Sequence, residues 1–143
     1  MLDAHAQHAS MGGLELMPVN SRRKGARGEL ELANHLKEEF GWEARRTQQY
    51  AGHSGDASDV VISQMPSLHV EVKRVQHLNL TAAMAQAIRD CHGKTPTVWH
   101  RKDRGGWMVT LRLEDLISIA EMVVAAKCMK AGDKGTQSKS DSI

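Results

Sequence analysis

Two short runs of aliphatic and β-branched residues near the middle of the chain predict a β-hairpin. The first run is Val60–Ile62 and the second is Leu68–Val72, and both have a composition typical of strands. The segment between them, Ser63–Ser67, contains Pro66 and two serines, which favour a turn. We therefore expect two antiparallel strands joined by a five-residue loop.

The expected register of this hairpin places two acidic residues side by side. We expect Val60 to face Val70, and side chains alternate between the two faces of a strand. One face then carries Val60, Ile62, Leu68, Val70 and Val72, and the other carries Asp59, His69, Glu71 and Lys73. Asp59 lies opposite Glu71 in this register, with about 4.5 to 5.5 Å between facing positions.

The pairing of Asp59 with Glu71 has two interpretations. Like charges opposed this closely are unfavourable unless a positive group lies between them. A divalent cation is the simplest candidate, since Mg²⁺ typically takes one or two carboxylates from a protein. Lys73 adds a second positive charge on the same face. The alternative is the solvated face of a two-sided antiparallel sheet, on which charged residues are ordinary.

The segment before the hairpin predicts a helix with one acidic residue on its apolar side. Asn20 and Ser21 are plausible caps, and Gly41 follows the last periodic residue, Phe40. The apolar stripe of this helix consists of Leu30, Leu32, Ala33, Leu36 and Phe40. Glu29 falls within that stripe, where a carboxylate is costly unless it is paired or bound to a cation. The alternative to a role in a site is that Glu29 pairs with a nearby arginine near the start of the helix.

The remaining patterns predict three strands and two helices. The expected elements are a strand Trp42–Tyr50, a loop Ala51–Ser58, a helix Leu80–His92, strands Thr95–Arg101 and Trp107–Leu113, and a last helix Glu114–Lys127. The core stripe of the middle helix is Leu80, Ala83, Met84, Ala87, Ile88 and Cys91. In the last helix, Leu116, Ile117, Ala120 and Val124 lie on one side and Ile119, Met122 and Ala126 on another. This apolar surface is wide enough to include a subunit interface.

The 143 residues fit a single domain. We expect a disordered leader over residues 1–20, a folded domain over 21–127 and a disordered polar tail over 128–143. The two distant cysteines, Cys91 and Cys128, argue against a disulfide framework and favour a reducing, cytoplasmic setting. No stretch approaches the roughly 18 apolar residues of a membrane span.

Basic residues occur in clusters although the net charge is only +2. Any affinity for nucleic acid must therefore come from local clustering rather than from bulk charge. The candidates for nucleic-acid binding are Arg23, Lys24, Arg27, Arg45, Arg46, Arg74, Arg101 and Lys102, with His53 as a further phosphate contact. Ordinary solvation is the alternative for each of these side chains.

The spacing of Asp59 and the run Glu71-Val72-Lys73 resembles the signature of the PD-(D/E)xK nuclease superfamily. The longer run from Gly55 to Arg74 is similar to phage-type members regarded as Holliday junction resolvases, and the likeness extends over roughly residues 21–117. Ser58 stands where the superfamily signature has proline. The resemblance implies an α/β restriction-endonuclease-like core, in which helices flank a mixed sheet in the order αβββαββα.

The resemblance also implies an activity and a set of site residues. It implies a metal-dependent DNA endonuclease that hydrolyses phosphodiester bonds, selectively in branched DNA. Mg²⁺ or Mn²⁺ would be held by Asp59, Glu71 and the Val72 carbonyl, with Glu29 completing or orienting the site. Lys73 would position the attacking water. Gln86 corresponds to a glutamine that several nuclease branches carry on the following helix, and Asp56 is the alternative first carboxylate.

The expected partners follow from this activity. A resolvase cuts two strands at symmetric positions, so we expect a homodimer, with no membrane and no small-molecule cofactor. A phage-derived protein would act in the cytoplasm of the bacterial host. Two rival interpretations stay open: another repair or restriction-type nuclease on the same core, and a non-catalytic nucleic-acid-binding module with a relict site.

Overall fold

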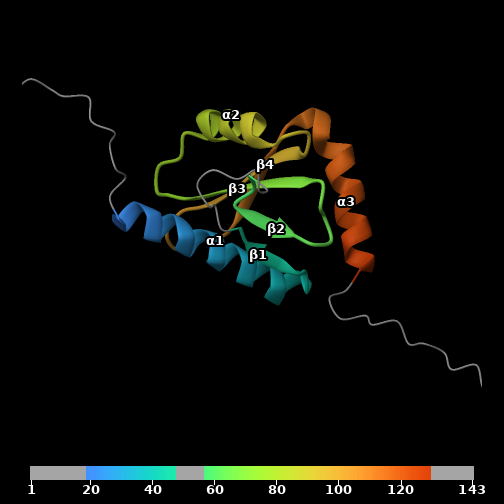
Figure 1. Ribbon diagram of the computed structural model, residues 1–143, viewed down its shortest axis with the longest axis horizontal. Helices are drawn as coiled ribbons and strands as arrows, with labels where there is room; N and C mark the ends of the chain where they lie inside the picture. The colour runs from blue at the N-terminus through green and yellow to red at the C-terminus, as the bar shows by residue number, and fades with distance from the viewer. Residues whose placement is uncertain (1–18, 48–56, 130–143) are drawn as a thin grey trace, which may run out of the picture.

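The computed structural model describes residues 19–47 and 57–129, and its element order is the one that the sequence predicts (Figure 1). The described elements are α1 (Val19–Phe40), β1 (Ala44–Arg46), β2 (Val60–Ile62), β3 (Leu68–Arg74), α2 (Leu80–Asp90), β4 (Thr95–Arg101), β5 (Met108–Leu111), a 3-10 turn η1 (Leu113–Asp115) and α3 (Leu116–Cys128). The order αβββαββα and the α/β class are confirmed.

The strands form one mixed five-stranded sheet in the order β1-β2-β3-β4-β5. Strands β3 and β4 run parallel, whereas the other neighbouring pairs are antiparallel. The parallel pair requires a crossover connection, and α2 supplies it. Helices α1 and α2 lie on opposite sides of the sheet (Figure 1).

The hairpin of β2 and β3 has the predicted loop and register. Val60 pairs with Val70, and the loop covers Ser63–Ser67. Two backbone hydrogen bonds close it: Met65 N donates to Ile62 O at 2.9 Å, and Leu68 N donates to Met65 O at 3.1 Å. Both strands of the hairpin were therefore placed correctly by their hydrophobic pattern.

Both faces of β3 are buried, contrary to the interpretation of a solvated charged face. Leu68 and Val70 belong to the larger core, which also contains residues of α1 and α3. The alternating residues His69 and Glu71 point to the other face, and they are only 1% and 3% exposed. Helix α2 covers this second face, where its alanines pack against Val98 of β4.

The helices bury narrower stripes than the sequence predicts. In α1 the buried stripe is Leu32, Ala33 and Leu36, whereas Leu30 and Phe40 are exposed. In α2 the buried residues are Ala83 and Ala87, with Met84 packed against them, while Leu80 and Ile88 are exposed. Leu30 and Ile88 lie at the edges of their stripes. Phe40 and Leu80 are the last and first residues of their helices.

The end of the chain departs from prediction in two ways. Strand β5 ends at Leu111, and Leu113 lies in η1 and is exposed, because β5 pairs with β4 only from Met108 to Leu111. Helix α3 begins at Leu116 rather than at Glu114. Its side with Ile119, Met122 and Ala126 packs on the core, whereas Leu116, Ile117 and Val124 of the other side are exposed.

The first strand is shorter than the expected Trp42–Tyr50: β1 covers only Ala44–Arg46. The predicted residues 48–50 and the loop residues up to 56 lie outside the described part of the chain. So do most of the predicted leader and tail, and the domain boundaries at 20 and 127 therefore stay predictions. Within the described ranges, no helix is long and apolar enough to cross a membrane.

Candidate active site

Asp59 stands immediately before β2, and its backbone and side chain both bind β3. Its amide nitrogen donates to Val70 O at 2.8 Å, and its Oδ2 accepts from Val72 N at 2.8 Å. Thr47, the residue after β1, donates from its backbone N to Asp59 O at 3.1 Å. The sequence predicted that Asp59 pairs directly opposite Glu71, and this prediction is wrong: the paired register of β2 with β3 contains Val60 and Val70 but not Asp59. Its carboxylate is anchored on the backbone of β3 instead.

Glu71 and Lys73 project from the face of β3 that α2 covers. Lys73 Nζ lies 2.9 Å from Glu71 Oε1. It also donates to Gln86 Oε1 of α2 at 3.0 Å. The glutamine that only the family resemblance singled out is thus in direct contact with the lysine of the Glu-x-Lys motif.

Glu29 reaches the same region from α1. Its Oε2 forms an ion pair with Arg46 Nε at 2.6 Å. Glu29 is thus paired with an arginine, but the partner comes from β1 and not from the start of α1, where the sequence placed it. Glu29 also lies near enough to raise the pKa of Asp59. Glu29 can contact Arg46 and lie near Asp59 at the same time, because Arg46 is in β1, which pairs with β2, and Asp59 immediately precedes β2.

The two central carboxyl groups have opposite pKa shifts. Burial, followed by the negative charges of Glu71 and Glu29, raises the pKa of Asp59 from its ordinary value of 3.8 to about 7, against the lowering effect of the Val72 amide and Lys73. Burial also raises the pKa of Glu71, but the neighbouring His69 and Lys73 outweigh it and hold that pKa below its ordinary value. Without a cation, Glu71 is therefore the ionised member and Asp59 the one that retains a proton near neutrality.

The arrangement of these groups fits a hard divalent cation. Burial is the main cause of the raised pKa of Asp59, and the negative charges of Glu71 and Glu29 add to it; a cation bound there would favour the ionised form. Asp59 and Glu71 offer carboxylate oxygens, and Mg²⁺ commonly takes one or two carboxylates and completes its shell with other oxygens. Across residues 19–47 and 57–129, no group of three or more His, Cys, Asp or Glu side chains is arranged around a common metal position.

Two buried polar residues near Glu71, Ser58 and His69, were not selected as site residues from the sequence. Ser58 and His69 are almost fully buried, and Ser58 Oγ lies 3.2 Å from His69 Nδ1. The other ring nitrogen, Nε2, lies 3.7 Å from Glu71 Oε2. Strand alternation placed His69 on the same face as Glu71, but nothing in the local pattern indicated that this face is buried.

Comparison with known proteins adds a family to this geometry. Residues 20–139 match the model of a family described as "Phage putative PDDEXK endonuclease". The chain belongs to this endonuclease family. No curated protein matches it.

Among solved structures, the endonuclease chain is similar to Hjc, a Holliday junction resolvase from the archaeal hyperthermophile Archaeoglobus fulgidus. The two are 21% identical over 59% of this chain and 74% of that chain, with a TM-score of 0.43. A likeness this distant carries no argument about the site, and the family assignment depends on the match to the family model.

Three of the basic residues predicted to bind nucleic acid are held by acids of the endonuclease itself. Arg46 pairs with Glu29. Arg74 and Arg101 both pair with Glu31, Arg74 at 2.9 Å. Arg74 also pairs with Asp103 at 3.1 Å, and Arg101 lies 5.7 Å from the centre of the Trp107 ring. These contacts tie α1 to β3 and β4.

The other basic candidates of the endonuclease are distributed over its surface. The exposed ones are Arg23, Lys24 and Arg27 on α1, Arg45 on β1, and Lys102 after β4. His53 and the alternative carboxylate Asp56 lie outside the described residues. Nothing in the fold therefore bears on the choice of Asp56, whereas Asp59 is placed beside Glu71.

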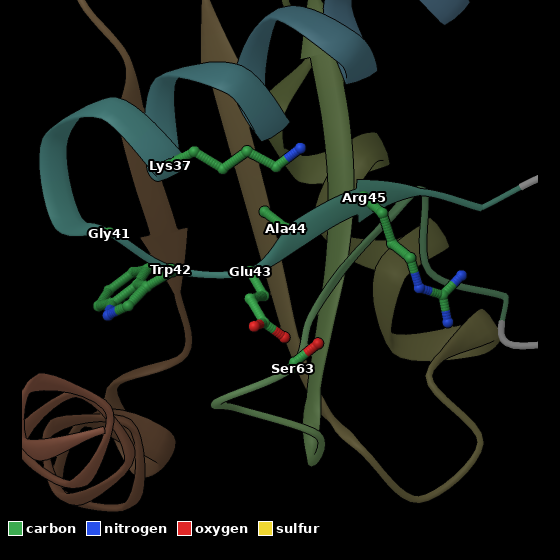
Figure 2. Close-up of a pocket in the computed structure, with 7 residues that line it drawn as sticks. All are labelled: Lys37, Gly41, Trp42, Glu43, Ala44, Arg45 and Ser63. Carbon is green, nitrogen blue, oxygen red and sulfur yellow. The ribbon is translucent and has the colours of Figure 1, made fainter. Parts of the chain in front are cut away.

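A hollow of about 530 Å³ lies where α1 leads into β1 of the endonuclease (Figure 2). Its lining residues are Lys37, Gly41, Trp42, Glu43, Ala44, Arg45 and Ser63. In Figure 2 the Glu43 side chain points toward Ser63. None of Glu29, Asp59 and Glu71 lines this hollow, so it is separate from the candidate active site.

Proposed function

We propose that this protein is a metal-dependent DNA endonuclease that hydrolyses phosphodiester bonds and prefers branched DNA, as the resemblance to resolvases implies. The single observation that carries the proposal is the contact of Lys73 with both Glu71 and Gln86, next to an Asp59 carboxylate anchored on Val72. Membership of the endonuclease family supports the same reaction class.

Asp59, Glu71 and the Val72 carbonyl would hold Mg²⁺ or Mn²⁺, and Glu29 would help to orient the site through its contact with Arg46. A cation bound there supplies Lewis acidity to a phosphate oxygen and lowers the pKa of a water. Asp59 must lose its proton to act as a ligand. Its pKa of about 7 means that this loss occurs close to neutral pH.

Lys73 is suited to act on the attacking water or the scissile phosphate. An ammonium group has three N–H donors. Two are directed at Glu71 and Gln86, and the third can donate to a water or to a phosphate oxygen. Because the Lys73 side chain is 28% exposed, DNA can approach it. Its positive charge would offset the charge that develops on the phosphate as the water attacks.

The partners proposed with this activity are branched DNA and a second copy of the chain. The exposed side of α3, with Leu116, Ile117 and Val124, supplies apolar surface for a symmetric contact. Two-fold symmetry matches a substrate that is cut at two symmetric positions. No small-molecule cofactor is needed for this chemistry, and the place of action would be the cytoplasm of a bacterial host.

Synthetic four-way junctions, replication-fork mimics and linear duplex, each incubated with and without Mg²⁺, test the proposal. We expect cleavage that requires the metal and is fastest on the four-way junction. Glu71→Gln should remove it, whereas Glu38→Gln, at an exposed position of α1, should not. Equal cleavage of all substrates would favour a repair or restriction-type nuclease. DNA binding without any cleavage would favour a non-catalytic binding module.

A further inference from the structure

We propose that His69 is a positioning residue: held by Ser58 at Nδ1, it presents an Nε2–H group to Glu71 and fixes the orientation of that carboxylate for the cation. The inference rests on the proposed metal site, and it assigns a role to two residues other than Asp59, Glu71 and Lys73: His69, and Ser58 at the position where the signature has proline.

The ring of His69 is enclosed and has one nitrogen without a hydrogen-bond partner. The side chain is 1% exposed, and Nε2 is a buried atom with no hydrogen bond. Its nearest acidic group is Glu71 Oε2, at 3.7 Å. A buried polar nitrogen without a partner is unfavourable, so a small shift of the Glu71 carboxylate toward Nε2 would satisfy both groups.

The contact with Ser58 selects the tautomer of the ring. A neutral imidazole carries its proton on one nitrogen and accepts on the other. If the Ser58 hydroxyl donates to Nδ1 across 3.2 Å, the proton lies on Nε2 and faces Glu71. The opposite tautomer would direct the Nε2 lone pair at a carboxylate oxygen in a place closed to water, which is electrostatically unfavourable.

Ser58 and His69 are themselves held by their neighbours. Thr47 Oγ1 donates to the Ser58 carbonyl, and Thr97 Oγ1 donates to His69 O at 2.7 Å. Ser58 stands at the position where the superfamily signature has proline, which has no hydroxyl to offer. The contact from Ser58 through His69 to Glu71 therefore depends on the residue that differs from the signature.

Once Oε2 has moved toward Nε2, the Glu71 carboxylate would be supported at both oxygens. Lys73 lies 2.9 Å from Oε1, and His69 faces Oε2. An ionised carboxylate has about four lone-pair positions, so acceptor capacity remains for a cation. Side chains that orient a metal ligand in this way typically change metal affinity by about 10- to 100-fold when they are replaced.

Two substitutions at the same position separate this role from a packing role. His69→Gln can place its amide nitrogen near the position of Nε2 and so keep a donor toward Glu71. His69→Asn is shorter, so its amide can reach toward Ser58 but not toward Glu71. The measurement is Mn²⁺ binding to the full chain without DNA, by electron paramagnetic resonance, with circular dichroism and thermal unfolding as checks on folding.

We expect His69→Asn to bind Mn²⁺ about 10-fold more weakly than wild type, and His69→Gln to recover much of the loss. A residue needed only for packing would change stability in both variants and leave the Mn²⁺ affinity of the folded protein unaltered. Wild-type affinity in His69→Asn, or no recovery in His69→Gln, would overturn the proposal.

The tautomer is a second readout that needs no substitution at position 69. In ¹⁵N NMR of the metal-free wild-type protein, we expect Nε2 of His69 to carry the proton. A ring protonated on Nδ1 alone would overturn the proposal even if both His69 variants failed to fold. Ser58→Ala should increase the population of the other tautomer and weaken Mn²⁺ binding. An unaltered tautomer in Ser58→Ala would remove Ser58 from the mechanism.

Wild type and Glu71→Gln serve as the reference pair. If wild type binds Mn²⁺ no better than Glu71→Gln does, the proposed metal site fails, and this inference fails with it. If wild type binds clearly better but the His69 and Ser58 variants match wild type, only the role of His69 is lost.

Discussion

Val72 N donates a hydrogen bond to Asp59 Oδ2 at 2.8 Å, so the first acidic side chain of the site is anchored on the strand that carries the second. The amide of Val72 lies between Glu71 and Lys73 in the chain. This bond therefore sets the position of Asp59 relative to both residues of the Glu-x-Lys motif, and it does so without a metal.

The carboxylates Asp59 and Glu71 can be tested by amide replacement. Asp59→Asn retains an oxygen for Val72 N, and Glu71→Gln retains the shape of the side chain, so both variants should fold. Each should lose Mg²⁺-dependent cleavage, because a neutral amide is a poor substitute for an anionic ligand of a hard cation. Binding of DNA without metal should persist in both variants. It should strengthen in Glu71→Gln, since Glu71 is the carboxylate that is ionised without a cation and its replacement removes a negative charge.

Gel assays of cleavage and fluorescence anisotropy for binding check these expectations, with Glu38→Gln as the matched control. Retained cleavage in both variants would eliminate the proposed carboxylate pair and return Asp56 to consideration.

The raised pKa of Asp59 predicts that the metal-free protein becomes less stable as pH rises. Burial, Glu71 and Glu29 place this pKa at about 7 in the folded state, above its ordinary value of 3.8. Between these values the folded state holds the proton and the unfolded state does not, so the free energy of unfolding falls with increasing pH. The loss attributable to Asp59 is on the order of a few kcal/mol at most.

Urea unfolding at several pH values between 4 and 8 in the presence of EDTA measures this effect, and Asp59→Asn is the comparison. Glu71 acts in the opposite sense at lower pH, because its pKa is lowered and its contribution is lost as pH falls. A wild-type minus Asp59→Asn difference that stays flat across this range would contradict the pKa assignment.

Lys73→Ala should abolish cleavage and also weaken DNA binding, unlike the carboxylate variants. The substitution removes a positive charge from beside the scissile phosphate and leaves Glu71 and Gln86 without their shared partner. Lys37→Ala, at an exposed position of α1, is the charge-matched control. Cleavage by Lys73→Ala at the wild-type rate would exclude the role proposed for the lysine.

Ile117→Asp or Val124→Asp should convert the expected homodimer into a monomer. Both side chains are exposed, at 70% and 65%, so a charge there is harmless in a monomer and costly in an apolar interface. Leu80→Asp, at an exposed position in the first turn of α2, should leave the oligomeric state unchanged. Light scattering at micromolar concentration, with and without junction DNA, makes the comparison. A wild-type monomer under both conditions would refute the dimer.

A truncated chain spanning Ser21 to Lys127 should fold and retain the activity of the full chain. The first and last described helices begin at Val19 and end at Cys128, so the cuts remove at most a few residues from each. Circular dichroism and the junction-cleavage assay are the measurements. Loss of folding would show that residues beyond these limits contribute to the core.

The local parts of the site followed from the sequence alone. Alternation along β3 was sufficient to place Glu71 and Lys73 on one face, because a strand has a fixed period of two. Loop composition and apolar pairing were sufficient for the register of Val60 with Val70. Each of these inferences uses residues close in sequence, within one hairpin.

Only the tertiary structure decided which groups surround that hairpin. The crossover through α2 covers the face of β3 that carries His69 and Glu71 and brings Gln86 to Lys73. The packing of α1 brings Glu29 to Arg46. Strand periodicity specifies which side chains share a face, but whether that face is buried depends on a helix that packs across it from elsewhere in the chain. The burial that raises the pKa of Asp59 and encloses His69 is for this reason a property of the assembled fold.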